Sequence, residues 1–217
     1  MVLQASRDNQ KDTQCGTSSL SRTISALKTQ QNPGYFPSDD SPLRLLMDRI
    51  GTPIGEMVIV ADGEGNLRAT FWTDRETQLQ ESLQRQYGEK GFTLEATSNP
   101  QGLTNAIARY FAGEVTAIDS LPVQTGGTAF QREVWGALRE ISCGTTISYA
   151  RLAERIGRPK AVRAVGLANG SNPVGVVVPC HRVIGTDGSL TGYGGGIERK
   201  RWLLEHESKY AAFRLHA

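Results

Sequence analysis

A cysteine followed by two basic residues is the part of this chain best suited to covalent chemistry. The segment reads Val176-Val177-Val178-Pro179-Cys180-His181-Arg182-Val183. The apolar run has the composition of a strand, so we expect Cys180 at the end of an extended segment. The thiolate is the nucleophilic form of cysteine, and neighbouring cationic side chains favour it. The alternative is a buried structural cysteine, because free cysteines are among the most buried residue types.

Length and composition indicate an ordinary globular protein. The chain has 217 residues, which allows one large domain or two small ones. It lacks an apolar run long enough to cross a bilayer, and its first residues do not resemble a secretory signal. The three cysteines are widely separated and odd in number, which favours a reducing compartment over a disulfide framework. We therefore expect a cytoplasmic protein that makes no membrane contact.

The counts of histidine and charge restrict the partners. With only three histidines and no Cys-x-x-Cys pair, the chain has too few well-spaced ligands for a structural zinc site. We expect neither a metal nor a cofactor. The net charge is only +2, so any nucleic acid must be held by a local basic patch.

Patterning divides the chain into five parts. We expect a polar extension over 1–40, an α/β domain over 41–120, a linker over 121–128, a mainly helical domain over 129–208 and a tail over 209–217. Within the α/β domain the patterns predict a hairpin, two helices and an edge strand. The hairpin strands are Met57–Ala61 and Asn66–Trp72, the helices are Glu76–Tyr87 and the segment of Leu103 to Phe111, and the edge strand is Gly91–Glu95.

The helical domain contains a helix-turn-helix pattern. An apolar stripe through Tyr149 and Leu152 predicts the first helix, Gly157-Arg158-Pro159 ends it, and a second helix is expected to begin at Lys160. The pair is locally basic, which suits phosphate contacts, through Arg151, Arg155, Arg158, Lys160 and Arg163. The second helix has few long polar side chains, which argues against ordinary major-groove readout. A small-residue helix with its arginines in solvent remains the alternative.

Several further motifs accompany the cysteine. They are Lys160-Ala161-Val162-Arg163-Ala164-Val165-Gly166, Asn172-Pro173, Gly192-Tyr193-Gly194-Gly195-Gly196 and Trp202-Leu203-Leu204-Glu205-His206-Glu207. Together with Pro179–Val183, and in this order, they resemble the O6-alkylguanine-DNA alkyltransferases, also called methylated-DNA-protein-cysteine methyltransferases, of the bacterial constitutive type. The resemblance covers roughly residues 41 to 207. It implies an α/β fold with a small ribonuclease H-like N-terminal domain and a mainly helical winged helix-turn-helix C-terminal domain.

The resemblance also implies a reaction. Cys180 would take the alkyl group from O6-alkylguanine in double-stranded DNA and keep it, so that each molecule acts once. A water molecule would link Cys180 to His181, and Glu207 would orient His181, as in hydrolytic triads. Tyr149 would crowd the 3′ phosphate and help protonate the guanine, and Asn172 would organise the turn before the cysteine.

Other roles follow from the same resemblance. The nucleotide must leave the stacked duplex, and Arg163 would fill the space it vacates. The expected DNA-binding residues are Arg163, Tyr149, Lys160, Ala161, Ala164, Gly166 and Arg151. The expected substrate pocket consists of Val183, Tyr193, Gly194, Trp135 and Pro179.

Three other functions remain open at this stage. A lesion sensor of related fold would lack the reactive cysteine, a winged helix-turn-helix regulator would not need the Pro-Cys-His-Arg motif, and a cysteine hydrolase would turn over. The expected state is a monomer. The sequence leaves open whether molecules cooperate on DNA and whether O4-alkylthymine is accepted.

Overall fold

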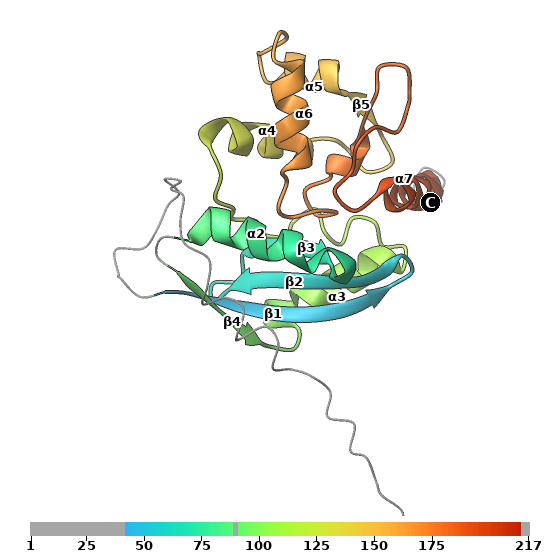
Figure 1. Ribbon diagram of the computed structural model, residues 1–217. Helices are drawn as coiled ribbons and strands as arrows, with labels where there is room; N and C mark the ends of the chain where they lie inside the picture. Colours follow the sequence, from blue (N-terminus) through green and yellow to red (C-terminus); the bar gives the residue numbers. More distant parts are fainter. Residues whose placement is uncertain (1–41, 89–90, 214–217) are drawn as a thin grey trace, which may run out of the picture.

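The computed structural model describes residues 42–88 and 91–213 (Figure 1). The predicted extension over 1–40, with Cys15, lies outside the described residues. The N-terminal part contains β1 (Leu43–Thr52), β2 (Gly55–Asp62), β3 (Leu67–Trp72), α2 (Glu76–Tyr87), β4 (Phe92–Ala96) and α3 (Leu103–Phe111). The C-terminal part contains α4 (Ala129–Arg139), β5 (Ile147–Ser148), α5 (Tyr149–Arg155), α6 (Val162–Gly170), β6 (Val183–Ile184) and α7 (Ile197–Phe213). This confirms the predicted α/β class with a helical C-terminal domain.

The N-terminal sheet has the strand order β3-β2-β1-β4. Strands β2 and β3 form the predicted antiparallel hairpin, and β4 is the predicted edge strand, parallel to β1. The sequence analysis missed β1, although it pairs with both β2 and β4. Only Leu45 of this strand is buried, and polar residues interrupt the run. Its conformation therefore depends on its two neighbouring strands more than on an apolar period of its own.

The two sides of the sheet are covered by different helices. Alternate residues of a strand point to opposite faces, and in β2 Val58 packs in one hydrophobic cluster with Leu79 of α2. The next residue, Ile59, packs in another cluster with Ile107 of α3. Burying each such side chain contributes about 1.5–3 kcal/mol. Strand β2 is apolar on both faces and thus holds one helix on each side of the sheet.

The cluster on the α3 side continues into the C-terminal domain. It joins Ile107 and Tyr110 to Val134 and Leu138 of α4 and to Leu203 of α7. The segment predicted as a linker is attached to the sheet edge, because Leu67 of β3 donates its N–H to the Pro122 carbonyl. The two parts of the described chain therefore share one apolar core.

The helix pair forms as predicted, with one correction. Gly157, at φ 71°, follows the end of α5. Helix α6 begins at Val162, two residues later than expected, because Lys160 belongs to the turn that Ala161 closes by donating its N–H to the Arg158 carbonyl over 2.8 Å. Helix α7 continues to Phe213, so the predicted tail over 209–217 begins inside a helix.

Candidate functional site

The segment before Cys180 is a compact turn, which corrects the expected extended conformation. Val178 donates its N–H to the Val174 carbonyl, and Cys180 donates its own to the Val178 carbonyl. Val176 has φ 69°, a strained conformation for a β-branched residue. A single turn of 3-10 helix, Cys180–Arg182, follows. An apolar run cannot distinguish a strand from a buried turn, because both exclude water from their side chains.

Two features hold this turn in place. Thr70 of β3 donates its N–H to the Pro173 carbonyl over 2.9 Å and its hydroxyl to the Gly175 carbonyl over 2.7 Å. Asn172 spans the turn, since its Nδ2 donates to the Val178 carbonyl over 2.7 Å while its Oδ1 accepts from the Val174 N–H. The N-terminal sheet and one asparagine thus fix the approach to the cysteine.

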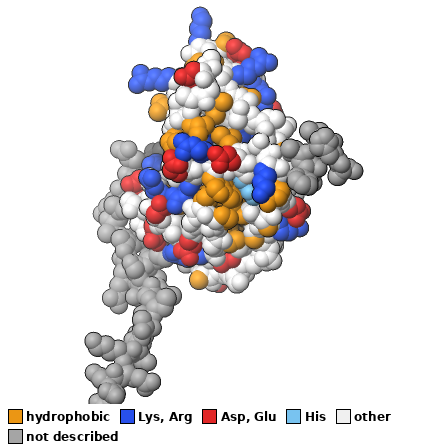
Figure 2. Space-filling view, turned by 90° about the vertical axis from the view of Figure 1, so that its right-hand side faces the viewer, with side chains coloured by type: hydrophobic (Ala, Val, Ile, Leu, Met, Phe, Trp, Pro, Cys, Tyr) orange, Lys and Arg blue, Asp and Glu red, His pale blue; other side chains and the backbone are white. Residues whose placement is uncertain are grey.

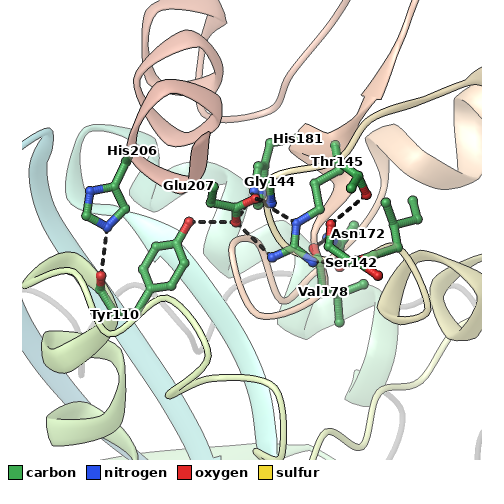
Figure 3. A network of polar contacts seen from close by, with 11 residues as sticks. Tyr110, Ser142, Gly144, Thr145, Asn172, Val178, His181, His206 and Glu207 are labelled. Atoms are coloured by element: carbon green, nitrogen blue, oxygen red, sulfur yellow. Dashed lines mark hydrogen bonds and ion pairs between the residues drawn. The ribbon is translucent and has the colours of Figure 1, made fainter. Parts of the chain in front are cut away.

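Glu207 is the centre of a buried polar network (Figure 3). Its Oε1 lies 3.0 Å from His181 Nε2 and accepts hydrogen bonds from Arg182 Nη2 and from the Tyr110 hydroxyl over 2.8 and 2.9 Å. Its Oε2 accepts from Arg182 Nε and from the Gly144 N–H. Both carboxylate oxygens of this α7 residue are therefore fixed by partners from α3, from the segment after α4 and from the turn that follows Cys180.

The charges of this network follow from its geometry. Burial opposes ionisation of Glu207, but His181 and Arg182 outweigh it and hold the pKa of the carboxyl well below its usual range. For His181, burial lowers the pKa despite the contact with Glu207. The network at neutral pH is thus a carboxylate, a guanidinium and a neutral imidazole. Nδ1 of His181 has no hydrogen-bond partner among the described residues.

The environment of the thiol differs from the sequence-based expectation. Arg182 does not activate Cys180, because its guanidinium binds Glu207 and the Ile141 carbonyl. Burial raises the pKa of Cys180, and a hydrogen bond from Asn172 and the charge of Lys200 only partly oppose that increase. The resting residue is a thiol, and its deprotonation requires an acceptor during the reaction.

Lys200 is a functional candidate that the sequence analysis missed. It is fully buried on α7, and its Nζ donates to the Val183 and Thr191 carbonyls over 2.6 and 2.7 Å. Burial lowers its pKa. A lysine within a mixed charged helix gives no signal of burial in the sequence. The same holds for Tyr110, whose apolar period indicated only a core position.

Cys180 lines a cavity of about 320 Å³ between the two parts of the chain. The lining includes the predicted residues Tyr193, Gly194, Asn172 and Cys180, and also Trp72, Arg75, Asn169 and Gly195. Trp135, Pro179 and Val183, which were expected in the pocket, do not line this cavity. The Trp135 indole instead donates to the Ala168 carbonyl inside the helix cluster. Aromatic residues at core spacing do not reveal from sequence which of them border a cavity.

The helix pair presents the predicted basic surface. Lys160, Arg163 and Ala164 are exposed, whereas Ala161, Gly166 and Tyr149 are partly buried. A Cβ at Gly166 would lie 3.9 Å from the Tyr149 ring, an ordinary van der Waals contact, so the packing of α6 on α5 does not itself require glycine here. Lys and Arg side chains project from the upper end of the molecule, where Figure 1 places α5 and α6 (Figure 2).

Two of the five basic residues have acidic partners. Arg151 pairs with Glu154 over 2.9 Å, and Arg158 pairs with Glu133 over 3.1 Å. Exposed pairs of this kind contribute little to stability and can exchange for phosphate contacts. The surface therefore keeps its capacity to bind an anionic backbone.

No metal site competes with this interpretation in the part of the chain that the structure describes. Within residues 42–88 and 91–213, no three His, Cys, Asp or Glu side chains group as ligands, and no helix has the length and apolar character needed to cross a membrane. Independence from metals and cofactors stays a prediction.

Two solved structures with a similar fold come from Mycobacterium tuberculosis. A Mycobacterium tuberculosis O6-methylguanine methyltransferase superposes with a TM-score of 0.61 at 37% identity, covering 76% of this chain and 94% of that one. The structure of Mycobacterium tuberculosis OGT in complex with DNA gives a TM-score of 0.63 at 40% identity, covering 77% and 94%. The fold and the buried cysteine site thus define a cysteine methyltransferase that acts in DNA repair.

Sequence comparisons specify the family. The ribonuclease-like domain of 6-O-methylguanine DNA methyltransferase matches residues 47–125, and the DNA-binding domain of the same family matches residues 129–209. A methylated-DNA–protein-cysteine methyltransferase of Shigella flexneri is 50% identical over 165 residues, which are 76% of this chain and 96% of that protein. A Haemophilus influenzae protein of the same name is 43% identical over 72% and 82%. The chain belongs to the 6-O-methylguanine DNA methyltransferase family.

Proposed function

We propose that this protein repairs O6-alkylguanine in duplex DNA by moving the alkyl group onto Sγ of Cys180, once per molecule. The observation that carries this assignment is the position of Cys180. It lines the cavity and is followed in the chain by His181, whose Nε2 contacts Glu207. The Cys180 sulfur attacks the alkyl carbon, the carbon–O6 bond breaks, and a thioether forms. The product guanine regains a proton at N1, which balances the proton lost by the thiol.

The buried network supplies the route for that proton. Neutral His181 accepts it at Nδ1 through a water molecule, and Glu207 stabilises the imidazolium that results. Because Arg182 and Tyr110 already hold the Glu207 carboxylate, little reorganisation accompanies the transfer. Tyr149 is the proposed donor that returns a proton to the departing guanine.

The basic helix pair brings the lesion to the cavity. Lys160 and Arg151 bind phosphates, while the small side chains of Ala161, Ala164 and Gly166 permit close approach to a groove. Arg163 fills the space left by the extruded nucleotide. In the cavity, Tyr193 and Gly194 contact the base, and the backbone around Cys180 binds its edge. The double-stranded lesion is the only partner required, and action as a cytoplasmic monomer stays a prediction.

The test is incubation with a duplex that carries one O6-methylguanine, followed by intact-mass and peptide analysis. We expect one added methyl group per molecule, located on Cys180, and none in Cys180→Ala. The matched control is Cys143→Ala, because Cys143 is half-buried with its pKa raised to about 12, mainly by burial. Lesion binding without a mass gain would identify a damage sensor, and continued turnover would identify a hydrolase.

A further inference from the structure

We propose that Trp72 and Arg199 are positioning residues that fix Tyr193 against the reacting thiol. This inference rests on the proposed function and extends it to the N-terminal domain. Trp72 ends β3 and is buried, and Arg199 lies in the first turns of α7. Their contacts meet at Gly195, in the loop that carries Tyr193.

Arg199 connects three separate segments of the chain. Its Nε donates to the Ile54 carbonyl over 2.8 Å, and its Nη1 donates to the Gly195 carbonyl over 3.0 Å and to Asp74 over 3.1 Å. The guanidinium carbon lies 4.6 Å from the centre of the Trp72 ring. A planar guanidinium can stack and donate in several directions at once, which a lysine cannot do.

Trp72 in turn contacts the wall of the cavity. A Cβ at Gly195 would lie 2.5 Å from Trp72 Nε1 and 2.6 Å from Tyr193 Cε1, so the indole and the phenol close tightly over this glycine. The indole N–H opposes part of the increase that burial causes in the pKa of the Tyr193 hydroxyl. Both rings line the cavity beside Cys180, and Tyr193 meets His181 edge-on at 6.5 Å between ring centres.

This arrangement has a kinetic consequence. The Tyr193 ring can guide a base toward Cys180 only if the ring itself is held, and Trp72 with Arg199 holds it from the other domain. Removing either residue should slow alkyl transfer and leave DNA affinity unchanged, because the residues proposed to contact phosphates lie on α5, α6 and the turn between them.

The experiment measures two quantities for Trp72→Phe and Arg199→Gln. One is the single-turnover transfer rate at saturating O6-methylguanine duplex, and the other is the affinity for that duplex in a Cys180→Ser background. We expect the rate to fall by about ten- to a hundred-fold, since small misplacements cost up to about a hundred-fold, with affinity within twofold. Arg201→Gln is the matched control, because Arg201 lies on the same helix and pairs with exposed Glu198.

A double-variant cycle tests the route through Tyr193. If Trp72 affects the rate through Tyr193, Trp72→Phe should add little to the loss caused by Tyr193→Phe. Independent, multiplying losses would overturn the proposal, as would unchanged rates in the single variants. In the unaltered protein the centres of the Trp72 and Phe111 rings are 6.4 Å apart, and Trp72→Phe keeps a ring at this position. The cycle therefore supplies a test even if Arg199→Gln fails to fold. Failure of the unaltered protein to methylate Cys180 would instead contradict the proposed function.

Discussion

Buried Lys200 shows how one side chain can serve both stability and reactivity at this site. Its ammonium group satisfies two backbone carbonyls in the loop region around the cavity. It also provides the positive charge that favours the Cys180 thiolate, while Arg182 is occupied by Glu207. Arg182, the cation close to Cys180 in the sequence, is thus not the one that acts on the thiol.

We expect Lys200→Met to weaken both properties. Two carbonyls would lose their partner, at about 1–3 kcal/mol each, and the Cys180 pKa would rise further. Urea unfolding measures the first effect, and the pH dependence of Cys180 alkylation, followed by peptide mass, measures the second. Lys209→Met is the control, because Lys209 is exposed on the same helix. An unchanged pH profile would show that Lys200 does not act on the thiol.

At the scale of elements, α6 separates two tasks. Its buried side chains, such as Val165 and Ala168, anchor the helix in the core, whereas its exposed side and the preceding turn carry Arg163 and Lys160. Because Lys160 precedes the helix, its side chain starts from a turn and not from a helical face. This position suits a phosphate contact better than base readout.

Lys160→Gln should therefore weaken binding to all duplexes by a similar factor. Loss of one phosphate contact reduces the slope of log K against log salt by about 0.9. Titrations with lesion and undamaged duplexes at several salt concentrations measure it. Arg44→Gln is the control, since Arg44 lies on β1 of the N-terminal sheet and pairs with Glu95 of β4, outside the basic helix pair. A loss confined to the lesion duplex would assign Lys160 to recognition of the damaged nucleotide.

At the scale of the whole molecule, the polar network joins the two domains. Tyr110 of α3 donates to Glu207 of α7, and His206 of α7 contacts the Tyr110 carbonyl over 2.7 Å and stacks on Trp202. These contacts surround the same apolar core that both domains share. Disturbing the charge of the network should therefore affect global unfolding.

Acid should destabilise the protein in two steps. The pKa of His181 is lowered in the fold, so the unfolded state binds its proton first, and stability falls as pH drops below about 6.5. The pKa of Glu207 is also lowered, so stability falls again below about 4.5. Thermal unfolding from pH 8 to about pH 3 covers the first step and the start of the second, and His181→Gln should remove the first step. A midpoint independent of pH across this range would contradict the assigned charge states.

Much of the fold was predictable because its signals are local. The apolar runs of the β2–β3 hairpin, helical spacing in α2 and α3, and the glycine and proline after α5 each act within a few residues. β1 and the turn before Cys180 were not predictable in this way. Their conformations are fixed by pairing partners and by Asn172 and Thr70, which lie elsewhere in the chain.

The sequence by itself indicated the proposed nucleophile, its histidine and the basic helix pair, and through ordered motifs it indicated the family. Tertiary structure decided what three cationic side chains contact: Arg182 binds Glu207, Lys200 binds two carbonyls, and Arg199 stacks on Trp72. It also decided that Trp135 belongs to the core and Trp72 to the cavity. The physical reason is that residue types and spacing specify local conformation, whereas burial and charge pairing depend on segments brought together by the shared core.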